Sequence, residues 1–289
     1  MLQLLAICLA FLSAFALYDD NLARDKFIGL ALGAHVVNGT VQSCLDKVFD
    51  GDVQVHKTYS VPCNNLYSNE TCLAYIAIYK KSQAIVIGFR GTVSGDQFKE
   101  EVVKTLFRPQ VRLFHDKVLV AQYFAETFNL FWSKTALKND LLKLELLRLN
   151  SYRIWITGHS LGGAIAALTA TQLALSYPLL KPRISLYTFG QPRVGNREYA
   201  ALHNLEVEES YRVVHNQDLV PNIPFPLMNY YHHDNEIYYK NDMSVKKAYA
   251  VCSAEDQSKL CQGGNQPSME IKDHLNYFGI DVEKHCDEN

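Results

Sequence analysis

The most constraining feature of the sequence is a short strand that runs into a Gly-x-Ser-x-Gly turn and then directly into a helix. Residues 153–157 predict the strand, and the alanine-rich stretch Leu161–Ser176 predicts the helix. The turn between them is Gly158-His159-Ser160-Leu161-Gly162. In so sharp a turn the residues two before and two after the serine lie close together, so Gly158 and Gly162 are needed there.

This turn predicts a nucleophilic serine. It presents the Ser160 hydroxyl at the carboxyl edge of a sheet, and it places the Leu161 N–H at a helix N-terminus, facing any developing oxyanion. A second N–H donor is expected at Thr92, because Gly91 lets the chain turn at the end of a buried apolar strand.

A serine hydroxyl needs a histidine to accept its proton and a carboxylate to orient that histidine. Serine elbows of this kind occur in α/β-hydrolases, where the chain order is Ser, then Asp, then His. Asp218 follows the apolar strand at residues 211–214 within a few positions, and neither Asp234 nor Asp242 follows such a strand so directly. We therefore expect Asp218 to be the acid.

The base is expected at His274, which lies late in the chain within residues 272–278. Of its four rivals, one precedes Asp218, two follow it by only 14 and 15 positions, and one is next to a cysteine. The residues alone leave these alternatives open: His215, His232, His233 and His285.

The rest of the pattern predicts a single α/β domain. Strands alternate with helices, which indicates a mainly parallel central sheet with helices on both faces. Strands are expected at 74–79, 84–89, 184–189 and 211–214, and helices at 20–36, 123–149 and 197–205.

The N-terminus predicts export. The apolar run at residues 2–15 is shorter than the roughly 20 residues that a bilayer span needs. Ala14 and Ala16 suit a signal peptidase, so residues 1–16 are expected to be a signal peptide and residues 17–289 a secreted domain without a transmembrane anchor. The net charge of −2 gives no indication of nucleic-acid binding.

Six cysteines remain after the signal peptide, and an even number in an exported chain favours disulfides over metal ligation. No tight Cys-x-x-Cys pair or cluster of Cys and His predicts a metal site. Asn38 and Asn69 each begin an Asn-x-Thr triplet, and both are expected to carry glycan.

Several blocks of the sequence, taken in order, resemble the class 3 lipases, whose best-known members are secreted fungal triacylglycerol lipases. The blocks are residues 89–92, 158–164, 189–196, 218–221 and 273–279. The resemblance implies an α/β-hydrolase fold, a triad of Ser160, Asp218 and His274, and an oxyanion hole formed by Thr92 and Leu161. It also implies three disulfides, which are Cys44–Cys286, Cys63–Cys72 and Cys252–Cys261.

The reaction expected from these residues is two-step acyl transfer through an acyl-enzyme, with no metal or organic cofactor. The implied substrate is a lipid ester, most directly a triacylglycerol, met at an oil–water or membrane interface. A phospholipase, a feruloyl-type esterase and a short-chain carboxylesterase on the same fold remain alternatives. A non-catalytic lipid-binding protein is disfavoured, because such a protein should have lost part of the triad.

Residues 94–109 are expected to form a mobile lid beside the site. Phe98, Val102 and Leu106 recur every four residues and therefore share one helical face, while charged residues occupy much of the rest. Closed, this apolar face would cover the acyl groove; open, it would rest on a lipid surface.

Replacing Phe98, Val102 and Leu106 with Ser tests the lid. Activity on emulsified triglyceride is expected to fall much more than activity on a soluble short-chain ester, because only the first substrate needs the apolar face. Equal loss on both substrates, with a lower melting temperature, would show instead that these side chains belong to the core.

Overall fold

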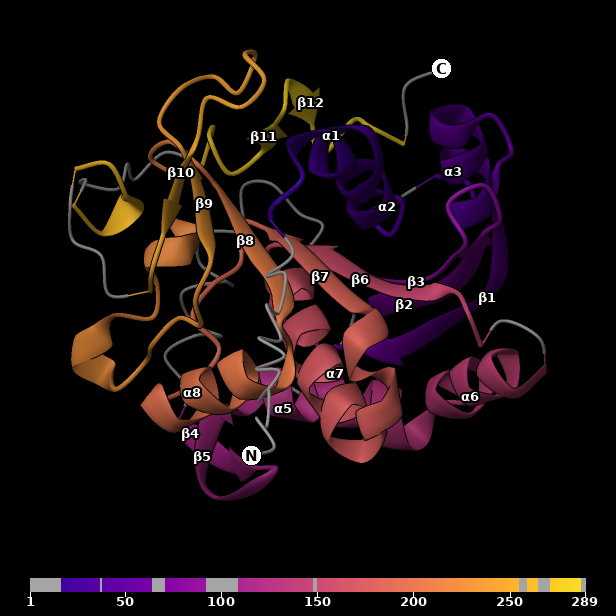
Figure 1. Ribbon diagram of the computed structural model, residues 1–289, viewed down its shortest axis with the longest axis horizontal. Helices are drawn as coiled ribbons and strands as arrows, with labels where there is room; N and C mark the ends of the chain where they lie inside the picture. Colours follow the sequence, from indigo (N-terminus) through magenta and orange to yellow (C-terminus); the bar gives the residue numbers. More distant parts are fainter. Residues whose placement is uncertain are drawn as a thin grey trace, which may run out of the picture.

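The computed structural model describes residues 17–36, 38–63, 71–91, 109–147, 150–254, 259–264 and 271–286. Within these residues the main sheet has the strand order β1-β2-β3-β6-β7-β8-β9-β10 (Figure 1). Strands β3, β6, β7, β8 and β9 pair in parallel, whereas β1, β2 and β10 add antiparallel pairs at the two edges. The bounds are β1 (Val53–Pro62), β2 (Thr71–Tyr79), β3 (Ala84–Phe89), β6 (Arg153–His159), β7 (Ile184–Phe189), β8 (Glu209–His215), β9 (Glu236–Tyr239) and β10 (Ala250–Cys252).

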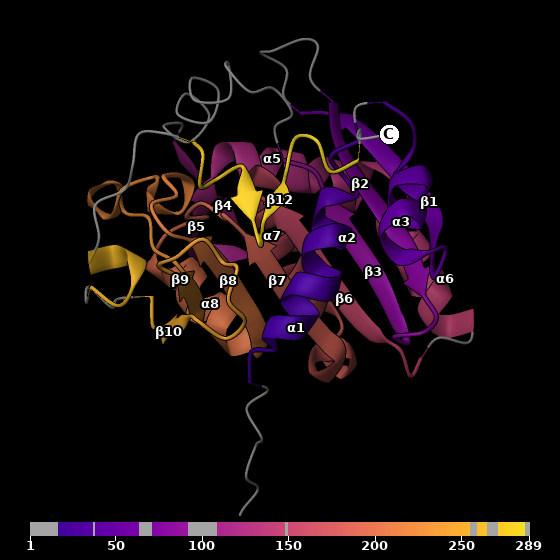
Figure 2. The same cartoon turned by 90° about the horizontal axis from the view of Figure 1, so that it is seen from above.

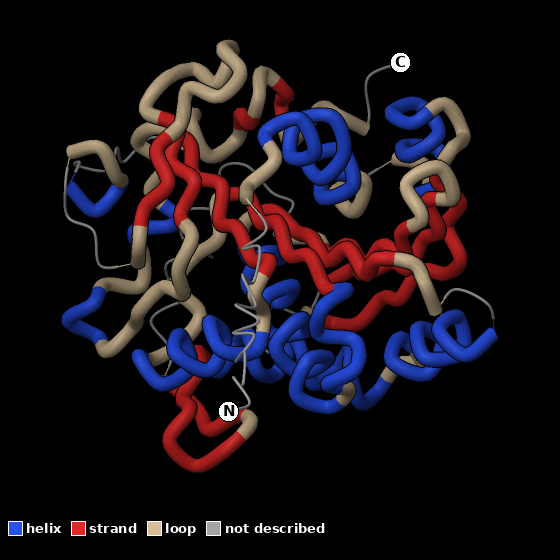
Figure 3. The backbone as a smooth tube through the Cα atoms, in the orientation of Figure 1, coloured by secondary structure: helices blue, strands red, loops and turns tan. Residues whose placement is uncertain are grey.

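Helices cover both faces of the sheet, as Figures 1 and 3 show. On one face lie α1 (Asp20–Leu22), α2 (Ile28–Leu32) and α3 (Val41–Phe49); on the other lie α5 (Gln122–Asn129), α6 (Leu137–Leu147), α7 (Leu161–Ser176) and α8 (Arg197–Glu206). Alternate residues of β3 enter the two cores, with Ile85 and Ile87 on the α7 side and Val86 on the α2 side. The predicted single domain with a mainly parallel sheet flanked by helices is confirmed.

For one helix and two strands, the sequence pattern predicted the first and last residue correctly. Helix α7 and strands β3 and β7 have the bounds that the sequence indicated. Small side chains let α7 lie close to the sheet, and its residues are buried nearly all round, as expected of a helix that is apolar on every side.

The long helix expected at 123–149 is instead two helices. A π-helical turn (Leu130–Lys134) ends the first, and Thr135 adopts an extended backbone between them. The Thr135 hydroxyl donates to the Phe131 carbonyl oxygen at 2.6 Å and accepts from the Leu137 N–H at 3.2 Å. Thr135 thereby ends one helix and caps the next, a role that the leucine periodicity does not reveal.

Two small ribbons lie outside the main sheet. One pairs β4 (Gln110–Leu113) with β5 (His115–Ala121), and the other pairs β11 (Asn276–Tyr277) with β12 (Ile280–Asp281). Figure 2 shows the second ribbon, from the C-terminal segment, beside α2. No helix in the described part of the chain is long and apolar enough to cross a membrane.

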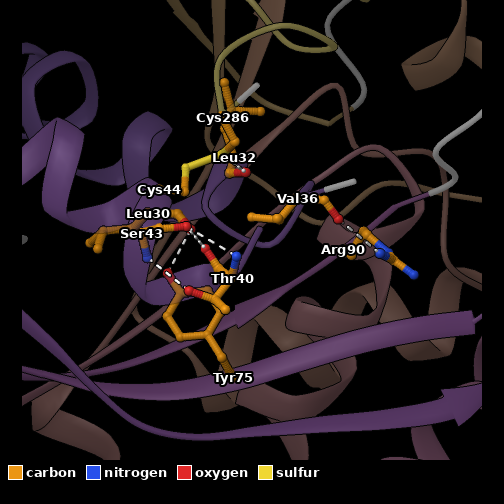
Figure 4. Close-up of a disulfide and its surroundings, with 9 residues drawn as sticks. All are labelled: Leu30, Leu32, Val36, Thr40, Ser43, Cys44, Tyr75, Arg90 and Cys286. Carbon is orange, nitrogen blue, oxygen red and sulfur yellow. Dashed lines mark hydrogen bonds between the residues drawn. A yellow bond between two sulfur atoms is a disulfide. The ribbon is translucent and has the colours of Figure 1, made fainter. Parts of the chain in front are cut away.

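A disulfide fastens the C-terminal segment to the first helices. Cys44 of α3 bonds to Cys286 across 242 positions of sequence, and Cys286 packs beside Leu32 at the end of α2 (Figure 4). Nearby, the Tyr75 hydroxyl of β2 donates to the Leu30 carbonyl oxygen at 2.6 Å and holds α2 on the sheet. The other disulfides are Cys63–Cys72 and Cys252–Cys261, so all three pairs match those that the resemblance implies.

Removing the long disulfide in a Cys44→Ser, Cys286→Ser variant is expected to lower the free energy of unfolding by about 2–5 kcal/mol, because the bond constrains most of the unfolded chain. Denaturant unfolding measures this loss. The matched control is Cys252→Ser, Cys261→Ser, which opens a loop of separation 9 and should cost less. An equal or larger loss in the control would contradict the prediction.

Candidate active site

The serine elbow forms where β6 meets α7. Ser160 has φ 57° and ψ −130°, a backbone conformation that L-residues adopt only under strain. A Cβ placed on Gly158 would lie 2.4 Å from the Gly162 carbonyl carbon, and one on Gly162 would lie 2.3 Å from the Phe89 oxygen. Neither glycine can therefore be replaced without moving the helix away from the strands.

The Ser160 side chain is fully buried, and its Oγ has no hydrogen-bond partner among the described residues. Leu161 is the first residue of α7, where N–H groups have no acceptor within the helix. A Cβ on Gly91 would lie 3.2 Å from Ser160 Cβ and 3.4 Å from Leu161 N, so the chain leaving β3 passes beside the elbow.

Four of the predicted site residues lie outside the described residues. Thr92, which is expected to complete the oxyanion hole, is one of them. It directly follows Gly91, and the structure places Gly91 beside Leu161 N. One glycosylation site is likewise undescribed, whereas Asn38 is exposed. The undescribed residues are Thr92, Phe98, Val102 and Leu106 of the site, together with Asn69.

Asp218 and His274 form a buried pair. The His274 Nδ1 lies 3.0 Å and 2.9 Å from the two Asp218 carboxylate oxygens, and both side chains are fully buried. Asp218 follows β8, and His274 comes from the C-terminal segment that the Cys44–Cys286 disulfide fastens. The predicted acid and base, which lie far apart in the sequence, are thus brought together in the fold.

Gly190 links this pair to the serine. It follows β7 with φ 59°, and a Cβ there would lie 2.8 Å from the His274 ring and 2.9 Å from Asp218 Oδ2. The carbonyl oxygen of the preceding residue, Phe189, accepts the Ser160 N–H at 2.8 Å. The three predicted triad members therefore gather at the carboxyl ends of β6, β7 and β8.

Each of the alternative acids and bases lies in another environment. Asp234 accepts from Asn204 and from the Ala254 N–H, whereas Asp242 accepts from Ser244 within its own turn. The four rival histidines contact other groups. His232 bonds to the Pro221 carbonyl oxygen, and the His233 ring stacks on His203 at 3.9 Å. His215 bonds to carbonyl oxygens of the C-terminal segment, and the backbone N–H of His285 bonds to the Asp281 carbonyl oxygen.

Tyr277 is a site residue that the sequence reasoning did not single out. Its hydroxyl donates to Asp218 Oδ2 at 2.7 Å, and the Val220 N–H donates to Oδ1 at 2.9 Å. Burial, and then the Asp218 charge, raise the pKa of Tyr277 well above 10, so the hydroxyl remains a donor. The only sequence signal was its place three residues after His274 in a matching block.

His159, the residue before the predicted nucleophile, was also missed. Its Nε2 lies 2.9 Å from the His274 carbonyl oxygen, so this nitrogen must carry the proton and donate. Burial, followed by the neighbouring His274 and His35, holds the pKa of His159 well below 6.5. A neutral His159 thus ties the backbone of the base to the elbow.

This arrangement suits nucleophilic acyl transfer. A histidine that binds a carboxylate through Nδ1 presents Nε2 as the proton acceptor, and a helix N-terminus stabilises an oxyanion. Within the described residues, no three or more His, Cys, Asp and Glu side chains gather in a metal-ligating group.

Comparison with known proteins identifies the family. Residues 86–228 match the family model described as Lipase (class 3). The chain is 30% identical over 298 residues to a lipase of Caenorhabditis elegans, covering 92% of this chain and 81% of the relative. The chain belongs to the class 3 lipase family.

Fungal lipases are similar to this chain in both sequence and structure. This class 3 lipase is 30% identical over 269 residues to a lipase of Rhizopus niveus, covering 88% of this chain and 62% of the relative's length. It superposes on the crystal structure of the lipase from Rhizopus microsporus var. chinensis with a TM-score of 0.76 at 26% identity, covering 91% of this chain and 88% of that chain. The expected α/β-hydrolase fold is thereby confirmed.

Tyr277→Phe tests the support of Asp218. The variant keeps the ring but removes a hydrogen bond to a buried charge, and such bonds contribute about 1.5–3 kcal/mol. We expect kcat on a soluble ester to fall by about 10-fold or more with KM little changed, since each 1.4 kcal/mol is tenfold. Tyr75→Phe, which loses a buried hydroxyl bond that involves no member of the triad, should keep its kcat. Unchanged kcat in Tyr277→Phe would refute the role.

Proposed function

We propose that this class 3 lipase is a secreted serine ester hydrolase whose substrates are triacylglycerols. The observation that carries the proposal is the buried Asp218–His274 pair beside a strained, buried Ser160. Family membership supports a lipid ester as the substrate. The chain spans 62% of the length of the Rhizopus niveus relative, so the proposal rests on the chain's own site.

In the proposed mechanism Ser160 attacks the ester carbonyl while His274 accepts the hydroxyl proton. The Asp218 carboxylate holds Nδ1 and stabilises the imidazolium that forms. The Leu161 N–H stabilises the tetrahedral oxyanion, with Thr92 as the proposed second donor. His274 then protonates the leaving alcohol and activates the water that hydrolyses the acyl-enzyme.

The proposed site of action is outside the cell. Residues 1–16 are proposed to be removed as a signal peptide, leaving the domain at 17–289. Three disulfides suit an oxidising compartment. Asn38 lies on the surface, where a glycan can be attached.

The decisive experiment compares triolein, phosphatidylcholine and methyl ferulate side by side. We expect triolein to be hydrolysed fastest. Faster hydrolysis of either other substrate would replace the proposed substrate class with a phospholipase or a feruloyl-type esterase. Hydrolysis of soluble short-chain esters alone would indicate a carboxylesterase.

Ser160→Ala is the control in each assay. Loss of a triad member lowers turnover by roughly 10⁴-fold or more. The variant should also resist labelling by a fluorophosphonate probe while keeping the wild-type melting temperature. A variant that still labels or turns over normally would exclude Ser160 as the nucleophile.

A further inference from the structure

The residues immediately before Asp218 and His274 contact each other directly. Asp273 precedes His274, and its Oδ2 accepts from Asn216 Nδ2 at 3.0 Å and from the Gln217 N–H at 3.1 Å. Asn216 and Gln217 are the two residues before Asp218. One carboxylate oxygen thus joins the loop of the base to the loop of the acid.

His215 makes a second connection between the same loops. Its Nδ1 lies 3.0 Å from the Asp273 carbonyl oxygen and 2.6 Å from the Asn276 carbonyl oxygen. Both partners are acceptors, so Nδ1 must carry the proton and donate to them. The ring is buried and packs edge-on against Tyr277 at 5.8 Å. His215 therefore holds the backbone on both sides of His274.

The His274 and Tyr277 side chains also bond to Asp218, but the backbone bonds near each loop do not set the separation of the two loops. Asn216 turns the chain after β8 with φ 38°, and its N–H bonds to the Tyr239 oxygen at 2.7 Å, within the sheet. The His274 loop is closed by a Leu275 N–H to Ile271 oxygen bond of 3.0 Å, within its own segment. Neither of these backbone bonds joins one loop to the other.

We propose that Asp273 and His215 are positioning residues that keep Asp218 and His274 in register for proton transfer. This inference rests on the proposed function, because it concerns the same site. Asp273 and His215 act through the acid and the base rather than on the substrate. A small displacement of the imidazole matters, because misplacement of about 1 Å costs about 100-fold in rate.

The chain offers a matched control. Asp242 lines the same pocket as His215 and Asp273. Its carboxylate, however, bonds within its own turn, to the Ser244 N–H at 3.0 Å and the Ser244 hydroxyl at 2.6 Å. Asp242→Asn therefore changes the charge of the pocket without touching either loop contact.

The test compares removal with conservative replacement in the full chain. Asp273→Ala and His215→Phe should each lower kcat on a soluble short-chain ester by about 10- to 100-fold, with KM within about twofold. Asp273→Asn retains an acceptor oxygen, and His215→Asn retains a donor near the place of Nδ1, so both should recover most of the activity. Fluorophosphonate labelling rates should follow kcat, and Asp242→Asn should match wild type.

Asn216→Ala removes one of the two bonds to Asp273 from the opposite loop, so it tests the contact even if Asp273→Ala does not fold. It should lower kcat in the same direction by a smaller factor. All assays are run well below the melting temperature of every variant. If wild type hydrolyses the ester while Asp273→Ala and Asn216→Ala keep full kcat and only melt earlier, the positioning role is wrong and the proposed function stands. If wild type hydrolyses no ester, both are overturned.

Discussion

The first turn of α7 lies directly against the ends of β3 and β6, and the position of the site depends on this contact. The approach is possible only because Gly158 and Gly162 have no side chains, since a Cβ on either would come within 2.4 Å of backbone atoms. Close packing gives such a contact no room to relax. It forces Ser160 into its strained conformation and brings Leu161 N beside the chain leaving β3.

A buried charge imposes the second requirement. Asp218 is fully buried, and a buried carboxylate is costly unless donors surround it. Two of its donors, His274 and Tyr277, come from the C-terminal segment, and the third is the nearby Val220 N–H. The segment that supplies these two donors must therefore be held firmly, and the Cys44–Cys286 disulfide fastens it to α3.

Histidines show how environment, rather than residue type, assigns a role. Burial lowers the pKa of His203 to about 3 and keeps the pKa of His233 well below 6.5, where the two rings stack inside the fold. His159 is likewise neutral and serves as a hydrogen-bond donor. Among the described histidines, only His274 has its Nδ1 on the Asp218 carboxylate, and in the sequence only its late position and the matching block at 273–279 pointed to it.

The sequence by itself determined the features that depend on neighbours along the chain. The bounds of α7, β3 and β7, the glycine elbow and the choice of Ser160 as the nucleophile candidate all follow from local periodicity and small residues. The cysteine count predicted disulfides, although their pairing came from the resemblance. Strand β1 was missed because its exposed and buried residues do not alternate regularly and a bulge interrupts its pairing.

Only the tertiary structure decided the contacts between distant segments. Asp218 meets His274 and Tyr277 across 56 and 59 positions, and the Asp273 contacts with Asn216 and Gln217 cross similar separations. Such pairings depend on where the C-terminal segment packs, which no periodicity within that segment specifies. Sequence therefore indicated which chemistry the chain can perform, and packing decided which acid, base and supporting groups meet at the serine.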